Sequence, residues 1–274
     1  MSASKLRRFS LAQRLFHLGL LLCFVCQAAT GLARMYVETA WGRGLTAFFG
    51  GHDQALNIHK TVGIVLIIIF VVHAVYILVR FKWSEFPAVI FSPDSILPRP
   101  ADLGQFVRHT LWLLGLGRPP RIDRWTYWEK FDYWAVFWGM VIIGGSGLIL
   151  YDPVITSRLM PGWIINPAFW VHRIEAILAM GHVFIIHFFV AHGRRHNFPM
   201  DTAMFEGSVS LDLARYERPA WMERLEQSGE LTRILVNGAS MPLRVLYYGF
   251  GLTVMAFCLF LLVGAMINAG GVSW

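Results

Sequence analysis

The chain has 274 residues, of which 56% are hydrophobic, 15% aromatic and only 15% charged, whereas a soluble domain carries roughly 25% charged residues. This composition argues against a soluble globular protein, because a soluble core needs a polar surface that so few charges do not supply. The net charge of +7 points to nucleic acid in a soluble protein, but in a membrane protein such an excess collects in the cytoplasmic loops.

Five segments are apolar enough to cross a membrane, which takes about 20 residues of helix. In chain order they are residues 15–33, 58–79, 133–151, 168–191 and 243–268. The first follows a basic segment, residues 1–14, but it is too long for a signal peptide and lacks a small-residue cleavage site. It therefore predicts a retained membrane helix. The sequence predicts an all-α integral membrane protein, with a four-helix transmembrane bundle in residues 1–240 and an additional membrane helix in residues 241–274.

The positive charges predict the orientation of these helices. Nineteen lysines and arginines lie in the N-terminal segment and in or beside the loops 81–130 and 193–240, against five on the other side. Because cytoplasmic loops carry the excess of lysine and arginine, we expect a cytoplasmic N-terminus and a C-terminus outside. This distribution also makes nucleic acid an improbable partner.

The two cytoplasmic loops differ in composition. Loop 81–130 contains six prolines and is predicted to be mostly irregular. Within it, residues 103–114 have apolar side chains at helical spacing and predict a helix that lies in the membrane interface or docks a partner. Loop 193–240 is polar and is expected at the cytoplasmic face.

The chain contains ten histidines, and those inside spans are candidate functional residues because an ionisable side chain in lipid is costly. His59 and His73 are 14 residues apart in the second span, which places them on one helix face about 21 Å apart. His172 and His187 are 15 residues apart in the fourth span, or about 22 Å. His17, near the cytoplasmic end of the first span, lies level with the lower members of these pairs.

Two layers of histidine indicate two cofactors rather than one metal cluster, because zinc ligands gather within a few ångströms of each other. Haem b fits this pattern, since imidazoles from facing helices take both axial positions while the macrocycle fills an apolar gap. His59 and His172 both begin their spans on the outside and are predicted to hold an outer haem. The inner haem needs His187 together with either His17 or His73, and spacing alone slightly favours His73.

Several short motifs resemble the diheme cytochrome b subunits of membrane formate dehydrogenases, nickel–iron hydrogenases and thiosulfate reductases. The similar features span roughly residues 7–224 and are Arg14-x-x-His17 with Thr30-Gly31, Ile58-His59-x-x-x-Gly63, His172 with His182 and His187, Glu129-Lys-Phe-Asp-Tyr-Trp134, and Phe205-Glu206-Gly207. The resemblance implies that His17 and His187 hold the inner haem and that His59 and His172 hold the outer one. It also implies the inner membrane of a bacterium.

The sequence departs from that family's pattern in three places. The histidine interval in the fourth span is one residue longer, which leaves His182 as an alternative to His187. His73 is an additional histidine that the formate dehydrogenase type does not require. The fifth span exceeds the usual four and is expected to serve packing or a partner subunit.

Other polar residues near the spans are candidates for a quinone site or for pairing with haem propionates. His73 is an inner haem ligand, a quinone-site group or a satisfied buried histidine, and His182 has a quinone-side or an interhelical role. The quinone candidates are His73, His182, Glu129, Asp132 and Tyr133, although surface ion pairing explains the last three equally well. The propionate candidates, for which plain membrane anchoring is the alternative, are Arg14, Arg80, Arg194, Arg195, Lys60 and Arg173.

These features predict an electron-transfer subunit with two haem b groups that exchanges electrons between an outer-face redox partner and menaquinone or ubiquinone near the cytoplasmic face. The partner is expected to be an iron–sulfur protein or a multihaem cytochrome, and it carries any substrate chemistry because this chain has no molybdopterin, iron–sulfur or nickel motif. The alternative is a subunit that oxidises quinol and passes the electrons to an outer reductase or multihaem cytochrome. Such a subunit would need the same haems and the same quinone site. A haem-free cation transporter lined by histidines is the alternative from another class, although the spans contain almost no acidic residues.

Overall fold

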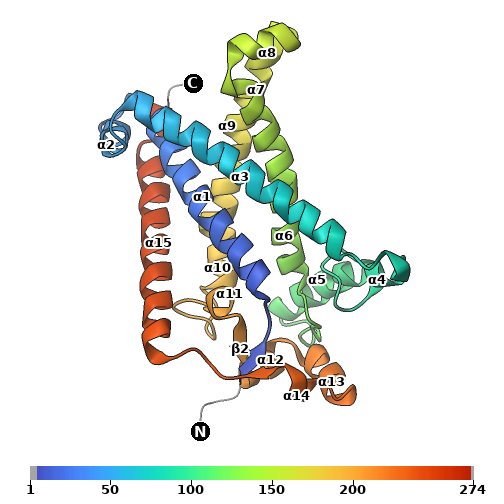
Figure 1. Ribbon diagram of the computed structural model, residues 1–274. Coiled ribbons are helices and arrows are strands. Elements are labelled where there is room, and N and C mark those ends of the chain that lie inside the picture. Colours follow the sequence, from blue (N-terminus) through green and yellow to red (C-terminus); the bar gives the residue numbers. More distant parts are fainter. Residues whose placement is uncertain (1–4, 273–274) are drawn as a thin grey trace. The chain divides into compact units, whose positions relative to one another are not determined.

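The computed structural model describes residues 5–272, and helices dominate it (Figure 1). Within that range five helical segments are long and apolar enough to cross a membrane: Leu11–Met35, His52–Arg80, Tyr127–Tyr151, Gly162–Ala191 and Met241–Ile267. They confirm the five predicted spans and the all-α fold class. Most extend a few residues beyond the apolar windows, because the backbone hydrogen bonding of a helix continues through polar residues at its ends.

Three spans are single α-helices: α1 (Leu11–Met35), α3 (His52–Arg80) and α15 (Met241–Ile267). The third span consists of α6 (Tyr127–Gly139), a π-helical segment (Met140–Gly144) and α7 (Gly145–Tyr151). The fourth consists of a 3₁₀ turn (Gly162–Ile164), α9 (Ile165–Gly181), a second π-helical segment (His182–His187) and α10 (Phe188–Ala191). Short helices join successive spans on one side, α2 (Ala40–Phe48) between α1 and α3 and α8 (Pro153–Leu159) between α7 and α9.

The chain forms two compact units. The first, the loop unit, contains the chain up to Leu11 and residues 77–137 and 202–244. The second, the bundle unit, contains residues 12–76, 138–201 and the chain from residue 245 onward. The predicted membrane spans thus lie mainly in the bundle unit, and the two long loops lie mainly in the loop unit.

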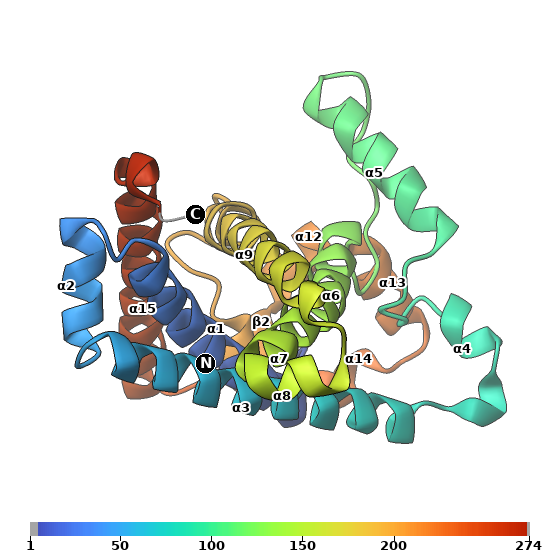
Figure 2. The same ribbon diagram turned by 90° about the horizontal axis from the view of Figure 1, so that it is seen from above.

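The fifth span packs against the first in the bundle unit (Figure 1, Figure 2). Leu261 and Cys258 of α15 are fully buried in one core cluster with Ala29 and Leu32 of α1. Small side chains at such a contact let two helix backbones approach closely, which is the main source of helix association in lipid. The additional helix is therefore an integral part of this unit.

The loop unit contains a short three-stranded sheet that the sequence did not indicate. Its strands β1 (Lys5–Arg7), β2 (Ser208–Ser210) and β3 (Leu235–Val236) are antiparallel, with β1 in the middle. Leu6 of β1 is fully buried and packs with Trp221. Strands of two or three residues show no readable alternation of apolar and polar side chains, so only the long-range pairing defines them.

The loop unit also contains several short helices. They are a 3₁₀ turn (Trp83–Glu85), α4 (Ala88–Phe91), α5 (Pro100–Leu113), α11 (Ala203–Glu206), α12 (Leu211–Glu217), α13 (Pro219–Gln227) and α14 (Leu231–Ile234). Helix α5 confirms the helix predicted for residues 103–114. It begins at a proline, and the Asp102 carboxylate accepts a hydrogen bond from the Arg99 N–H at 2.6 Å, which caps its first turn.

Candidate functional site

His59 of α3 and His172 of α9 face each other in the bundle unit. Their ring centroids lie 6.2 Å apart, and the two ring planes are inclined at 79°. Each histidine stands near the start of its helix, and both are partly buried. The structure thus brings together the two residues that the sequence predicted as a pair.

In both imidazoles, Nδ1 is the ring nitrogen that hydrogen-bonds to the protein. The Thr30 hydroxyl donates to the Cys26 carbonyl oxygen at 2.7 Å, so its oxygen accepts from the Nδ1–H of His59 at 2.9 Å. The Nδ1 of His172 lies 3.1 Å from the Ile143 carbonyl oxygen, which is only able to accept. A neutral imidazole that donates through Nδ1 keeps an unprotonated Nε2, and this is the form that binds a metal ion.

The distance between the two rings fits one iron ion between them. An imidazole nitrogen lies about 2 Å from the metal ion that it binds, so two imidazoles on opposite sides of one haem iron hold their ring centres roughly 6 Å apart. The observed 6.2 Å meets this requirement. Glycines leave room for both rings, because a Cβ at Gly31 would lie 3.6 Å from His59 Cε1 and one at Gly147 would lie 3.2 Å from His172 Cε1.

Two arginines accompany this pair, and the sequence analysis missed one of them. Arg34, in the last turn of α1, is within electrostatic range of His59, His172 and Arg173. Its Nε is buried and has no hydrogen-bond partner in the described part of the chain. Cations so placed repel each other, so the cluster favours a bound anion. Arg34 follows Thr30 by one helical turn, and that spacing was the signal that could have identified it.

The lower histidines lie around the second π-helical segment. His187 is its last residue, and a π-helical turn contains one residue more than an α-helical turn. Compared with an unbroken α-helix, this segment adds a residue to the interval between His172 and His187. His17 is within electrostatic range of His187 and His192.

His73 lies in a different setting from His17. Its ring packs edge-on against Phe16, with centroids 4.5 Å apart. His182, at the start of the π-helical segment, is half-buried.

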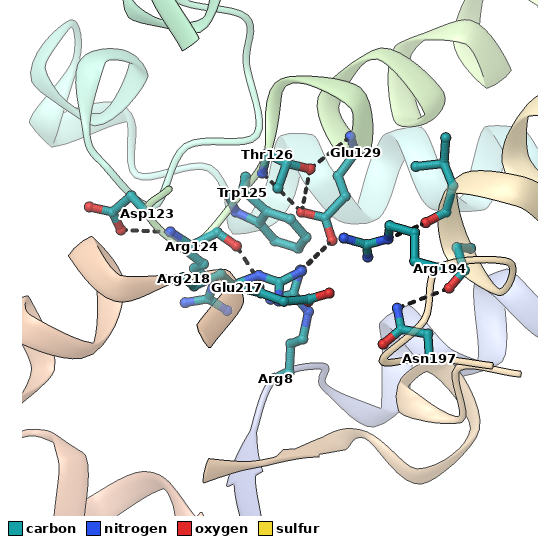
Figure 3. Close-up of polar contacts among 12 residues, drawn as sticks. Arg8, Asp123, Arg124, Trp125, Thr126, Glu129, Arg194, Asn197, Glu217 and Arg218 are labelled. Atoms are coloured by element: carbon teal, nitrogen blue, oxygen red, sulfur yellow. Dashed lines mark hydrogen bonds and ion pairs between the residues drawn. The ribbon is translucent and has the colours of Figure 1, made fainter. Parts of the chain in front are cut away.

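The three quinone candidates of the third span lie on α6 in the loop unit. Glu129 accepts from Arg8 and Arg218 and from the Thr126 hydroxyl and N–H (Figure 3). Its carboxylate is therefore committed to a buried ion-pair network. Tyr133 packs on Phe137 with ring centroids 5.3 Å apart, and Asp132 is half-buried beside it.

The propionate candidates occupy different environments. The Lys60 ammonium lies 5.2 Å from the centre of the Tyr151 ring, and the buried Arg173 guanidinium lies 5.0 Å from that of Phe169. The Nε of Arg194 donates to the Val190 carbonyl oxygen at 2.7 Å, which satisfies an open carbonyl at the end of α10 (Figure 3). Arg195 and Arg80 are exposed, and Arg14 is half-buried on α1.

His192, just beyond α10, is half-buried. Its Nδ1 accepts a hydrogen bond from the Asp201 N–H at 3.1 Å. Its ring centroid lies 6.2 Å from that of His187. Burial and, second, the neighbouring His187 lower the pKa of His192 to about 4, so its imidazole is neutral at pH 7. Its sequence context, His192-Gly-Arg-Arg-His196, resembles a solvated basic segment and gave no signal of this burial.

Comparison with known proteins shows what this chain is similar to. The chain is 23% identical over 228 residues to a protein named formate dehydrogenase, cytochrome b556(fdo) subunit, from Escherichia coli K12. Proteins of the same name from E. coli O6:H1 and O157:H7 are equally similar, and the match covers 81% of this chain and 94% of each relative. The sequence pattern of the family described as prokaryotic cytochrome b561 matches residues 8–207, which is most of the chain. The chain therefore belongs to the prokaryotic cytochrome b561 family and is a membrane-spanning b-type cytochrome, a family whose cofactor is haem b.

Proposed function

We propose that this protein is the diheme cytochrome b subunit of a respiratory oxidoreductase complex and that it carries electrons across the membrane. The observation that carries the proposal is the pair of imidazoles, His59 and His172, whose ring centroids are 6.2 Å apart and whose Nδ1 atoms hydrogen-bond to Thr30 and to the Ile143 carbonyl oxygen. Residues 1–240 form the diheme domain, and residues 241–274 add the fifth span.

His59 and His172 hold the outer haem. Thr30 and the Ile143 carbonyl fix the two rings through their Nδ1 atoms, which keeps both nitrogens directed at one ion without reorganisation. Haem b bound there supplies a one-electron carrier that changes between the ferric and ferrous states. The protein contributes an apolar setting and a fixed geometry, both of which set the reduction potential.

His17 and His187 hold the inner haem. We take His187, rather than His182, as the ligand, because His187 ends the π-helical segment that adds a residue to this part of the helix. His73, packed on Phe16, is the alternate ligand and a quinone candidate. Two ligand levels about 22 Å apart along one helix span most of the hydrocarbon core of a bilayer, which is about 30 Å thick.

Positive side chains neutralise the haem propionates. At the outer site this role falls to Arg173, Lys60 and Arg34, of which Arg34 has a buried Nε without a partner in the described residues. At the inner site Arg14, Arg80, Arg194 and Arg195 are the candidates. A propionate accepts hydrogen bonds from a guanidinium in a bidentate arrangement, and a buried charge needs such a partner.

The redox substrate on the cytoplasmic side is a quinone, either menaquinone or ubiquinone. Its reduction to the quinol takes up two electrons and two protons, and the electrons come from the outer-face partner, an iron–sulfur protein or a multihaem cytochrome. With the N-terminus in the cytoplasm and the C-terminus outside, the protons are taken from the cytoplasm. His182, Asp132 and Tyr133 are the candidates near the quinone, while Glu129 is held by Arg8 and Arg218.

The similarity to formate dehydrogenase cytochrome subunits supports a membrane complex in which another subunit carries the substrate chemistry. The same residues would serve electron flow in the reverse direction, in which the chain oxidises quinol and passes the electrons to an outer reductase. The 6.2 Å between the ring centroids of His59 and His172 favours iron ligation over a haem-free cation path, because it is the spacing of two imidazoles that share one metal ion.

The reduced-minus-oxidised visible spectrum of the purified full-length protein tests this function. We expect b-type bands and two haems per chain by pyridine haemochrome analysis. A preparation that is folded by circular dichroism and expressed with sufficient haem, yet contains none, contradicts the proposal. A single haem per chain contradicts its diheme part.

A further inference from the structure

Helix α5 of the loop unit exposes a row of apolar side chains. Leu103, Val107, Leu111 and Leu114 are 67%, 47%, 40% and 67% exposed. They follow one another at intervals of four, four and three residues, so they lie on one face of the helix and its C-terminal cap. Four exposed aliphatic side chains in a row form a contiguous apolar surface, which is typical of a site that contacts lipid or another protein.

The roughly opposite face of α5 is fixed to the start of the third span. The Lys130 ammonium donates to the Asp102 carboxylate at 2.9 Å, and their side chains are 2% and 9% exposed. The Tyr127 hydroxyl lies 2.9 Å from the Nδ1 of His109. Because Asp102 and His109 are seven residues apart, or about two turns, both lie on the side of the helix away from the apolar row.

This attachment determines the depth of α5 relative to the membrane. Tyr127 and Lys130 belong to the first turn of the third span, and the uncharged apolar run of that span begins at Tyr133. Such a change from charged to apolar residues marks the level at which a span enters the hydrocarbon core. A helix that two side chains hold to the first turn therefore lies at the level of the bilayer interface.

The charges beside the apolar row are positive. Residues 103–118 contain Arg108 and Arg118 and no acidic residue. Both arginines are exposed, and within residues 5–272 neither forms an ion pair with an acidic side chain. A helix with an apolar face and flanking arginines complements an anionic bilayer surface, because its apolar side chains enter the acyl boundary while the guanidinium groups remain at the phosphates.

We propose that α5 lies in the membrane interface, with its row of apolar side chains between the lipid acyl chains and with Arg108 and Arg118 on the phosphate groups of anionic phospholipids. The bilayer surface thereby holds the loop unit through α5 as well as through the spans that enter it. This surface contains none of the proposed haem ligands, so the proposal does not depend on the proposed function.

The test is photocrosslinking from α5 of the full-length protein in nanodiscs of phosphatidylcholine and phosphatidylglycerol. In the Val107→p-benzoylphenylalanine variant we expect illumination to produce phospholipid adducts, which mass spectrometry of the peptides measures. The matched control carries the same group in place of Gln227, an exposed polar residue of α13, and should give none. Lipid adducts that are absent at position 107, or equally abundant at both positions, contradict the proposal.

A second pair of variants tests the arginines. We expect position 107 to capture phosphatidylglycerol above its share of the bilayer, and this enrichment should fall about fivefold for each of Arg108→Gln and Arg118→Gln. The controls are Arg215→Gln and Arg233→Gln, which remove exposed arginines of α12 and α14 and should preserve the enrichment. Capture of the two lipids in proportion to their shares, with both arginines present, contradicts the phosphate contacts.

Illumination of the same Val107 variant in native membranes separates lipid from a protein partner. Lipid adducts there support the proposal, whereas a protein adduct in their place would show that α5 docks a partner subunit and would overturn it. Pyridine haemochrome analysis of the same preparations measures their haem content. A failure of this proposal is therefore distinguished from a failure of the proposed function.

Discussion

Buried charges are balanced in the loop unit but not at the outer histidine pair of the bundle unit. In the loop unit, Glu129 accepts from Arg8 and Arg218, and Lys130 lies 2.9 Å from Asp102. At the histidine pair, the charged neighbour of Arg34 is another cation, Arg173. The loop unit therefore completes its own ion pairs on folding, whereas the bundle unit holds cations suited to an anion from outside the chain.

Substitutions in the two units are therefore expected to change different properties of the protein. A charge removed from the loop unit leaves a buried partner uncompensated, so the free energy of unfolding falls. Removal of a charge or an axial ligand at the histidine sites changes the haem content or the reduction potential of the haem. The side chains there have their binding partner only when the cofactor is present. We expect the largest effect from loss of an axial ligand and the smallest from loss of a neighbouring charge.

Replacement of His172 by alanine removes one axial ligand of the outer pair, and we expect the purified protein to contain one haem per chain instead of two. Pyridine haemochrome analysis measures this ratio. His59→Ala should lose the same haem, recognised by its midpoint potential in a redox titration. His196→Ala serves as the control, and retention of two haems in His172→Ala would falsify the pairing.

The inner site is tested by comparing His17→Ala with His73→Ala. We expect His17→Ala to lose the inner haem, because His17 lies within electrostatic range of His187, and His73→Ala to keep both haems. Haem content and redox titration again distinguish the two. The reverse result would make His73, which packs on Phe16, the inner ligand.

The Glu129→Gln substitution breaks the ion-pair network of the loop unit. Arg8 and Arg218 are 3% and 4% exposed, so loss of their shared carboxylate should cost about 3–5 kcal/mol of unfolding free energy. Denaturant unfolding followed by circular dichroism measures the change. Glu223→Gln is the matched control, because Glu223 pairs with Arg121 on the exposed surface and should cost less than about 1 kcal/mol.

Glu206 makes the stability of the loop unit depend on pH. Burial opposes ionisation of this carboxyl, but the hydrogen bonds from Lys5 and the Ala239 N–H hold its pKa below the ordinary value. A pKa that is lower in the folded state stabilises the protein above the unfolded-state pKa, and this contribution is lost as the pH falls through the folded-state pKa.

We therefore expect Glu206→Gln to be less stable than the wild type at pH 7, by about 2 kcal/mol. The difference should shrink on acidification below about pH 4. Denaturant unfolding of both proteins across this range measures it. A difference that stays constant from pH 7 to pH 3 would show that the Glu206 charge is not the cause.

Arg34→Gln should lower the midpoint potential of the outer haem, because a nearby positive charge stabilises the reduced state of the iron and offsets a propionate. The expected shift is on the order of 50 mV, from one charge about 10 Å away in a medium of intermediate dielectric. A spectroelectrochemical titration measures it, with Arg43→Gln as the control because Arg43 is exposed. An unchanged potential with both haems present would contradict the role of Arg34.

Much of the membrane architecture was predictable because hydropathy and charge act locally along the chain. The five spans follow from apolar runs, and the outer histidine pair follows from the depths of His59 and His172 in their helices. The helix at residues 100–113 was also visible from its apolar spacing. None of these depends on contacts between distant residues.

The remaining features depend on contacts that the sequence does not encode locally. The β2–β1–β3 sheet joins segments about 200 residues apart, and the fifth span packs on the first in one core cluster. The π-helical insertion that carries His187 is a local change of hydrogen bonding, but nothing in the apolar pattern reveals it.

The sequence by itself determined the membrane-spanning class, the number of spans and the candidate ligands, because burial in lipid imposes a length and an apolar composition on each helix separately. Only the tertiary structure decided which atoms the Nδ1 of each imidazole contacts, which glycines make room for the rings and that Arg34 joins the outer pair. These depend on the rotation and close approach of one helix against another, and side-chain packing sets both.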